Sequence, residues 1–126
     1  MSPEALADGD AAQRLAAHAL GKPGARADQP WEGDHVAKVG EKIFAFLGEG
    51  GVGVKCGKGR TEADEWLAEY PDDASVMAYI GRNGWNTLRV GGAIPEGTLR
   101  EAIDTSYDLV VAGLPRSRRP AGGSAG

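Results

Sequence analysis

Few side chains in this sequence could carry covalent or metal chemistry. The chain has one cysteine, Cys56, and two histidines, His18 and His35. Zinc sites are built from three or four Cys, His or carboxylate ligands, and these residues do not supply such a set. The Gly-rich stretch 48–59 lacks the spacing of a phosphate-binding P-loop and is better explained as a hairpin loop. We therefore expect no cofactor, no metal ion and no enzymatic activity.

The remaining candidate nucleophiles have structural explanations. Cys56 lies between Lys55 and Lys58, which could activate an exposed thiol, but the strand pattern places it in the core. Ser106 and Tyr107 adjoin on a predicted helix, where packing explains both, since no general base neighbours the serine. The acidic run within residues 61–70 starts in the first turn of another predicted helix, where the helix dipole favours negative charge.

Basic residues are concentrated in parts of the chain. The net charge is −4, yet residues 35–60 carry five bases and two acids, whereas residues 61–75 carry six acids and no base. An acidic chain can bind phosphate only through a local basic patch, because Lys and Arg supply that affinity. The candidate nucleic-acid contacts, six bases and one aromatic, are Lys42, Lys55, Lys58, Arg60, Arg82, Trp85 and Arg89. The alternative is that these bases are ordinary solvated side chains.

The elements that position these residues follow from hydrophobic periodicity. Helices are predicted at 3–20, 61–70 and between Pro95 and Pro115, and strands at 35–39, 42–47, 52–56, 75–80 and 85–90. Thr61 is the expected N-cap of the middle helix, and residues 21–33 are expected to form a loop. Short connections make neighbouring strands antiparallel. The sequence thus predicts an α+β, two-layer fold of order α-β-β-β-α-β-β-α, with a five-stranded antiparallel sheet and helices on one face.

The loop at residues 48–51 predicts a strand register. If Leu47 pairs with Val52 across the loop, alternation places one set of apolar side chains on the helix-covered face. That set is Ile43, Ala45, Leu47, Val52, Val54 and Cys56. The opposite face then holds Lys42, Phe44, Phe46 and Lys55. One face is purely apolar, and the other combines aromatic rings with lysines.

The length of 126 residues fits one domain. We expect a domain at residues 1–115 and a disordered tail at 116–126, which is polar and Gly-rich. The lone cysteine, the polar first residues and the lack of an apolar run of about 18 residues predict a cytoplasmic protein without a membrane segment. We also expect a monomer.

Several short motifs, taken in order, resemble one known family. They are Lys42-Ile43-Phe44-Ala45, Val54-Lys55-Cys56, Trp85-Asn86-Thr87, Ser106-Tyr107 and Leu114-Pro115. Together they resemble the MmcQ/YjbR family over roughly residues 5–118. The resemblance implies a two-layer fold with an antiparallel sheet and a double-wing motif, and a protein predicted to bind DNA. The same architecture also resembles secretion chaperones, which bind peptides.

Two functions therefore remain open. In the first, the face of the sheet that combines aromatic rings with lysines, together with its hairpin loops, holds DNA. The bases named above contact phosphates, and Phe44, Phe46 or Trp85 adds apolar or stacking contact. In the second, the same face of the sheet docks a protein or peptide. One continuous basic patch would favour DNA, whereas an apolar groove with scattered charges would favour a protein partner.

Overall fold

The computed structural model describes residues 3–31 and 34–120 of the chain. The strands and helices follow in the order α1 (Pro3–Leu20), β1 (Ala25–Trp31), β2 (Asp34–Val39), β3 (Lys42–Leu47), β4 (Gly51–Lys55), α2 (Arg60–Glu69), β5 (Ala74–Val76), η1 (Gly81–Asn83), β6 (Trp85–Arg89), α3 (Glu96–Ala112) and η2 (Arg116–Arg118). The strands form one antiparallel sheet with the order β1-β2-β3-β4-β6-β5. The predicted α+β class with an antiparallel sheet is confirmed.

The sheet of the described chain has six strands, so the expected count of five is wrong. The additional strand is β1, in the segment expected to be a loop. Its sequence, ARADQPW, is polar and contains Pro30, and these features lower its apparent strand propensity. Both are tolerated here because β1 is an edge strand, and its register with β2 shifts between Asp28 and Trp31, around Pro30.

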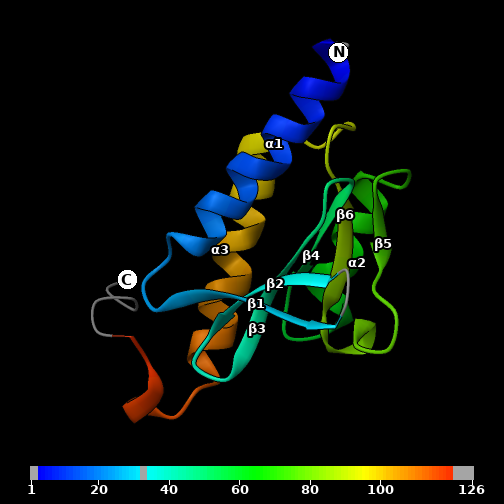
Figure 1. Ribbon diagram of the computed structural model, residues 1–126. Helices are drawn as coiled ribbons and strands as arrows, with labels where there is room; N and C mark the ends of the chain where they lie inside the picture. Colours follow the sequence, from blue (N-terminus) through cyan, green and yellow to red (C-terminus); the bar gives the residue numbers. More distant parts are fainter. Residues whose placement is uncertain (1–2, 32–33, 121–126) are drawn as a thin grey trace.

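The helices of the described chain pack on one face of the sheet. Figure 1 shows α1 and α3 lying side by side, with α2 toward the edge of the sheet formed by β6 and β5. α3 packs on β3 and β4, and α1 packs mainly on α3. The core between these layers includes the fully buried Leu15, Phe44, Leu88, Leu99 and Ile103. The amphipathic stripes of the helices and the apolar face of the sheet therefore form a single core.

The predicted hairpin register between β3 and β4 is confirmed, because Leu47 pairs with Val52 and Ala45 pairs with Val54. Cys56 is buried in the core, as predicted. The predicted orientation of Ile43 and Phe44 is wrong. Phe44 is fully buried, and its ring meets the edge of Tyr107 on α3 with 5.1 Å between centroids.

The cause is a β-bulge in β3. Ala37 of β2 pairs with Ala45, but the next residue, Lys38, pairs with Ile43, so Phe44 is an extra residue without a direct partner. A bulge interrupts the alternation of side chains. Phe44 therefore joins Ala45 on the helix-covered face, and Ile43 lies outside the core, half-buried beside Lys38.

Two further boundaries differ from the expected ones. β5 ends at Val76 instead of residue 80. Val76 pairs with Asn86, and Met77 bonds to Trp85, the first residue of β6, so the residues after Met77 have no partner strand among the described residues. α2 begins at Arg60, with Gly59 as N-cap, so the expected capping by Thr61 is wrong. For the expected tail, residues 116–118 form the 3-10 turn η2, and residues 121–126 lie outside the described residues.

Candidate nucleic-acid interface

The antiparallel topology brings four of the predicted bases to one end of the sheet. β3 begins at Lys42, and β4 ends at Lys55, which pairs with Trp85 at the start of β6. Because neighbouring strands run in opposite directions, the start of β3, the end of β4 and the start of β6 lie at the same end of the sheet. Lys58 lies in the short loop between β4 and α2, and Arg82 lies in η1, just before β6.

Arg89, another predicted site residue, lies at the opposite end of β6. There it pairs with Gly51, the first residue of β4. Its guanidinium faces Asp73 at 3.9 Å, and its side chain is 66% exposed. The structure therefore does not bring Arg89 together with Lys42, Lys55, Lys58 and Arg82.

Arg60, at the first position of α2, is engaged in internal contacts. Its Nη1 donates to the carbonyl oxygens of Gly81 and Trp85, at 2.7 and 3.2 Å. Its Nη2 donates to Asn86 at 3.0 Å and to Asp64 at 2.7 Å. These bonds tie α2 to η1 and β6, and they use most of the donors of the guanidinium. Arg60 therefore fixes the turn that carries Arg82 rather than offering a free charge.

Lys55 combines a structural bond with partial exposure. Its Nζ donates to the carbonyl of Asn83 at 2.5 Å, which fixes the last residue of η1. Partial burial lowers the pKa of this amine from its ordinary value. The charge is thus held beside Arg82 at a defined position.

The other three bases at this end are exposed. Lys42, Lys58 and Arg82 are at the surface, and within residues 3–31 and 34–120 they have no ion-pair partner. Their charges therefore remain available for a ligand.

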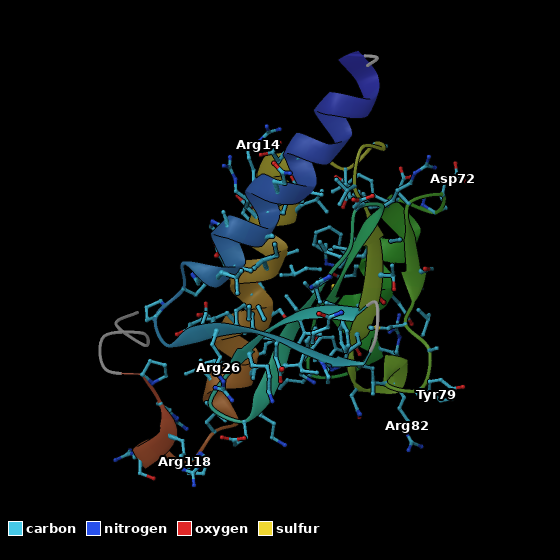
Figure 2. All side chains as sticks on the ribbon, viewed as in Figure 1. Arg14, Arg26, Asp72, Tyr79, Arg82 and Arg118 are labelled. Atoms are coloured by element: carbon cyan, nitrogen blue, oxygen red, sulfur yellow. The ribbon has the colours of Figure 1, made fainter. Side chains whose placement is uncertain are left out.

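The same end carries further bases that the sequence patterns did not single out. Figure 2 shows Arg26, Arg82 and Arg118 toward one end of the molecule, and Arg14 and Asp72 toward the other. Arg26 lies on β1 beside the β2–β3 turn, where it approaches Glu41 at 3.8 Å. Arg116 and Arg118 are exposed on η2, after Leu114, which lies against Gly40 of that turn. We call the following set the basic end: Arg26, Lys42, Lys55, Lys58, Arg82, Arg116 and Arg118.

The aromatic residues expected to contact DNA are mostly internal. Trp85 is only 9% exposed, and its ring meets the edge of the half-buried Phe46 at 5.8 Å between centroids. Phe44 is in the core. The exposed ring at this end is Tyr79, which is 98% exposed and projects near Arg82 in Figure 2. Tyr79 was not among the predicted contacts because residues 75–80 were assigned to a strand. The signal was its place two residues before the Gly81-Arg82-Asn83-Gly84 turn.

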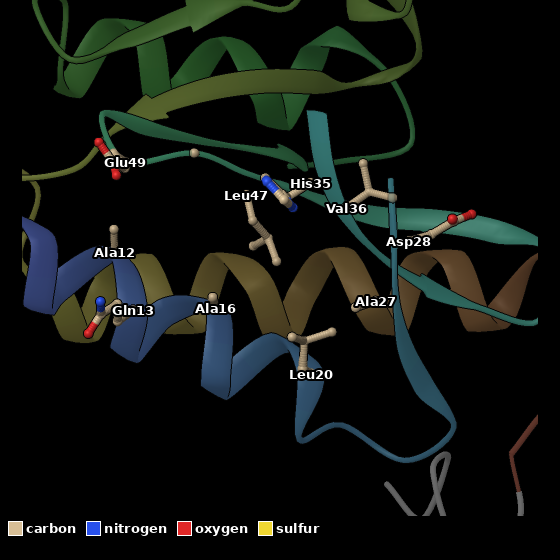
Figure 3. A pocket seen from close by; sticks show the side chains of 11 residues that line it. Ala12, Gln13, Ala16, Leu20, Ala27, Asp28, His35, Val36, Leu47 and Glu49 are labelled. Carbon is tan, nitrogen blue, oxygen red and sulfur yellow. The ribbon is translucent and has the colours of Figure 1, made fainter. Parts of the chain in front are cut away.

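A separate pocket of about 520 Å³ opens between α1 and the β1–β3 strands (Figure 3). Its apolar lining comes from Ala12, Ala16, Leu20, Ala27, Val36 and Leu47. Its polar lining comes from Gln13, Asp28, His35 and Glu49. The Asp28 carboxylate accepts from the Gln29 backbone N–H at 2.8 Å and from Lys38 at 3.3 Å, which lowers its pKa. The pocket is large enough for a small ligand or an apolar peptide side chain.

Two potential nucleophiles, Cys56 and Ser106, are buried in the described part of the chain. Burial raises the pKa of the Cys56 thiol to about 11, so the thiolate form is scarce at neutral pH. The Ser106 hydroxyl donates to the Phe44 carbonyl at 2.6 Å and accepts from the Lys55 backbone N–H at 2.8 Å. Within residues 3–31 and 34–120, no three His, Cys, Asp or Glu side chains are grouped so that they could hold a metal ion. Nor does any helix in the described ranges have the length and apolarity to cross a membrane.

Comparisons with known proteins agree on one family. The family model described as YjbR matches residues 20–109. The chain is 25% identical over 111 residues to the uncharacterised protein YjbR of Escherichia coli, both strain K12 and O157:H7, which covers 83% of this chain and 91% of that protein. Its fold matches the crystal structure of Deinococcus radiodurans protein DR2400, a DUF419 domain, with a TM-score of 0.73 at 20% identity, covering 85% of this chain and 83% of that one. The chain belongs to the YjbR family.

Proposed function

We propose that this protein binds DNA weakly and mainly through electrostatic contacts between the basic end and backbone phosphates. One observation carries the proposal: a chain of net charge −4 has exposed bases without an ion-pair partner, from four separate elements or loops, at a single end. Those bases are Lys42, Lys58, Arg82, Arg116 and Arg118. Lysine and arginine side chains that neutralise phosphates release counterions, and this release favours binding.

The arrangement favours phosphate contact over base reading. Sequence-specific readers usually insert a helix or a strand ribbon into the major groove. Here the helices of the described residues pack against the sheet, and the exposed side of α2 carries Glu62, Asp64, Glu65 and Glu69. Phosphates repel this acidic surface, so the turns at the basic end would approach DNA first. We therefore expect little sequence preference.

The test is a salt titration of binding to a short duplex. For each phosphate neutralised, the logarithm of the association constant should fall with a slope of about −0.9 against the logarithm of the salt concentration. The double variant Lys42→Ala/Arg82→Ala should bind more weakly, and its slope should be reduced by about two. Arg89→Ala is the matched control, because it removes the same type of charge from the other end of β6. The parent slope is expected for this control.

The proposal fails if the parent binds neither the duplex nor its separated strands at low salt, or if the slope is the same in the double variant. It also fails if Arg89→Ala lowers the slope as much as the double variant does, because binding would then follow total charge rather than the basic end.

A second candidate function rests on the pocket beside α1. An apolar cavity of about 520 Å³ with carboxylates at its polar side suits an apolar peptide segment that carries a basic residue. Binding of such a peptide would be insensitive to Lys42→Ala/Arg82→Ala, since these residues do not line the pocket. This function takes first place if neither the duplex nor its separated strands bind at low salt.

A further inference from the structure

Tyr79 has an unusual backbone and an unusual degree of exposure. Its φ angle is 67°, the only positive φ of a non-glycine residue in the described ranges. The Ile80 N–H donates to the Ala78 carbonyl at 2.7 Å, so Tyr79 occupies the centre of a γ-turn of the rarer, strained form. Its side chain is nonetheless 98% exposed. Packing within the described residues does not compensate for this strain.

The turn is held firmly on both sides. The Met77 N–H donates to the Trp85 carbonyl at 3.2 Å, and the Asn83 N–H donates to the Ile80 carbonyl at 3.0 Å. Arg60 binds the Gly81 carbonyl, and the Met77 side chain lies against Gly53 on β4. A strained residue persists when its surroundings fix it, and such residues are concentrated at functional sites. The Tyr79 ring is therefore presented to solvent from an ordered frame.

The charges around this ring fit a nucleic-acid strand. Arg82 is exposed three residues later and projects near Tyr79 in Figure 2. Lys55 is bonded to Asn83 in the same turn. Residues 74–95 contain no Asp or Glu, so no carboxylate of this segment repels a phosphate. An aromatic ring beside uncompensated bases is the combination by which proteins hold single strands, through base stacking and phosphate contact.

We infer that Tyr79 is a stacking platform for an unpaired base and that the basic end therefore prefers single-stranded DNA to duplex. This inference rests on the proposed function, because the basic end must first hold the phosphates. In a duplex, the base faces are covered by neighbouring bases, so the ring can contact only the terminal pair. Trp85 cannot take this role, because it is only 9% exposed and packs on Phe46.

The experiment measures dissociation constants of the full chain for three probes over a range of salt. The probes are a labelled oligothymidine of about fifteen nucleotides, the same strand with abasic residues, and a duplex of equal length. The parent should bind the oligothymidine more tightly than the other two. Tyr79→Ala should weaken oligothymidine binding by about 5- to 100-fold, with an unchanged salt slope. Tyr79→Phe should keep the parent affinity, because it keeps the ring.

The abasic strand is the matched control, since it keeps the phosphates and removes the faces on which a ring stacks. Tyr79→Ala should not change its affinity. The inference is overturned if Tyr79→Ala binds oligothymidine as tightly as the parent, or if it weakens the abasic strand equally. In both cases the slope loss in Lys42→Ala/Arg82→Ala would still support the proposed function. If no probe binds at low salt, the proposed function itself fails.

Discussion

At the residue scale, several side chains in the family-like motifs serve the fold rather than a ligand. Ser106 bridges β3 and β4 at the bulge, where the Phe44 carbonyl and the Lys55 N–H lie beyond the last paired residues of the hairpin. Asn86 is fully buried, donates to the Ala63 carbonyl at 2.9 Å and accepts from Arg60. Buried polar groups are retained when their hydrogen bonds are satisfied. These residues hold α2 and α3 in register with the sheet.

Ser106→Ala should lower the free energy of unfolding by about 1–3 kcal/mol. The substitution leaves a buried carbonyl and a backbone N–H without their partner, and a methyl group cannot replace the hydroxyl. The measurement is urea denaturation followed by tryptophan fluorescence. Thr105→Ala is the control, since Thr105 is exposed on the same helix, and it should change stability by less than about 0.5 kcal/mol. Equal effects of the two substitutions would contradict the bridging role of Ser106.

At the element scale, the sequence was sufficient to predict features that depend on neighbouring residues, namely one hairpin and the positions of the helices. The short loop after Leu47 fixed the pairing with Val52, and apolar spacing located the helices. The bulge at Phe44 was not predictable from KIFAFL, because it depends on pairing with β2 and on Ser106, which is 62 residues away in sequence. The polar edge strand β1 also had no apolar alternation that would have predicted it.

The candidate site was predictable only in part for the same reason. Four of the predicted bases lie at the same end of the sheet because neighbouring strands are antiparallel, and the predicted strand order already implied this. They are Lys42, Lys55, Lys58 and Arg82. The internal bonds of Arg60, the burial of Trp85 and the exposure of Tyr79 depend on contacts between distant segments. Residue type alone does not distinguish a structural arginine from a free one.

Because of the bulge, truncation of two neighbouring residues of β3 should affect stability to different extents. Phe44→Ala should lower the free energy of unfolding by about 3–5 kcal/mol, because it empties a fully buried site against Tyr107. Ile43→Ala should cost about 1 kcal/mol or less, since Ile43 is half-buried outside the core. Both variants are compared with the parent by denaturant unfolding. The reverse order of effects would mean that β3 alternates regularly and has no bulge.

At the scale of the whole molecule, exposed bases without an acidic partner are concentrated at one end. Arg26, Arg82 and Arg118 lie toward that end, and Arg14 and Asp72 lie toward the other (Figure 2). Arg14 and Arg89 at the other end face Glu96 and Asp73, and Glu49 occupies the β3–β4 turn, at the end of β3 opposite Lys42. An acidic protein with such an asymmetric field attracts a polyanion with one face and repels it with the rest. This asymmetry orients the approach, and it makes binding strongly dependent on salt.

If the basic end is one surface, the bases of η2 and those near the sheet edge should act together. Each phosphate contact on a single strand contributes about 0.7 to the salt slope. Arg116→Ala/Arg118→Ala should therefore reduce the slope of oligothymidine binding by about 1.4, and combination with Lys42→Ala/Arg82→Ala should reduce it by about 2.8. Arg116 and Arg118 are exposed and have no ion-pair partner among the described residues, so thermal unfolding should be unchanged. A parent-like slope for the η2 variant would restrict the interface to the turns around Lys42, Lys58 and Arg82, and would separate the end of the chain from binding.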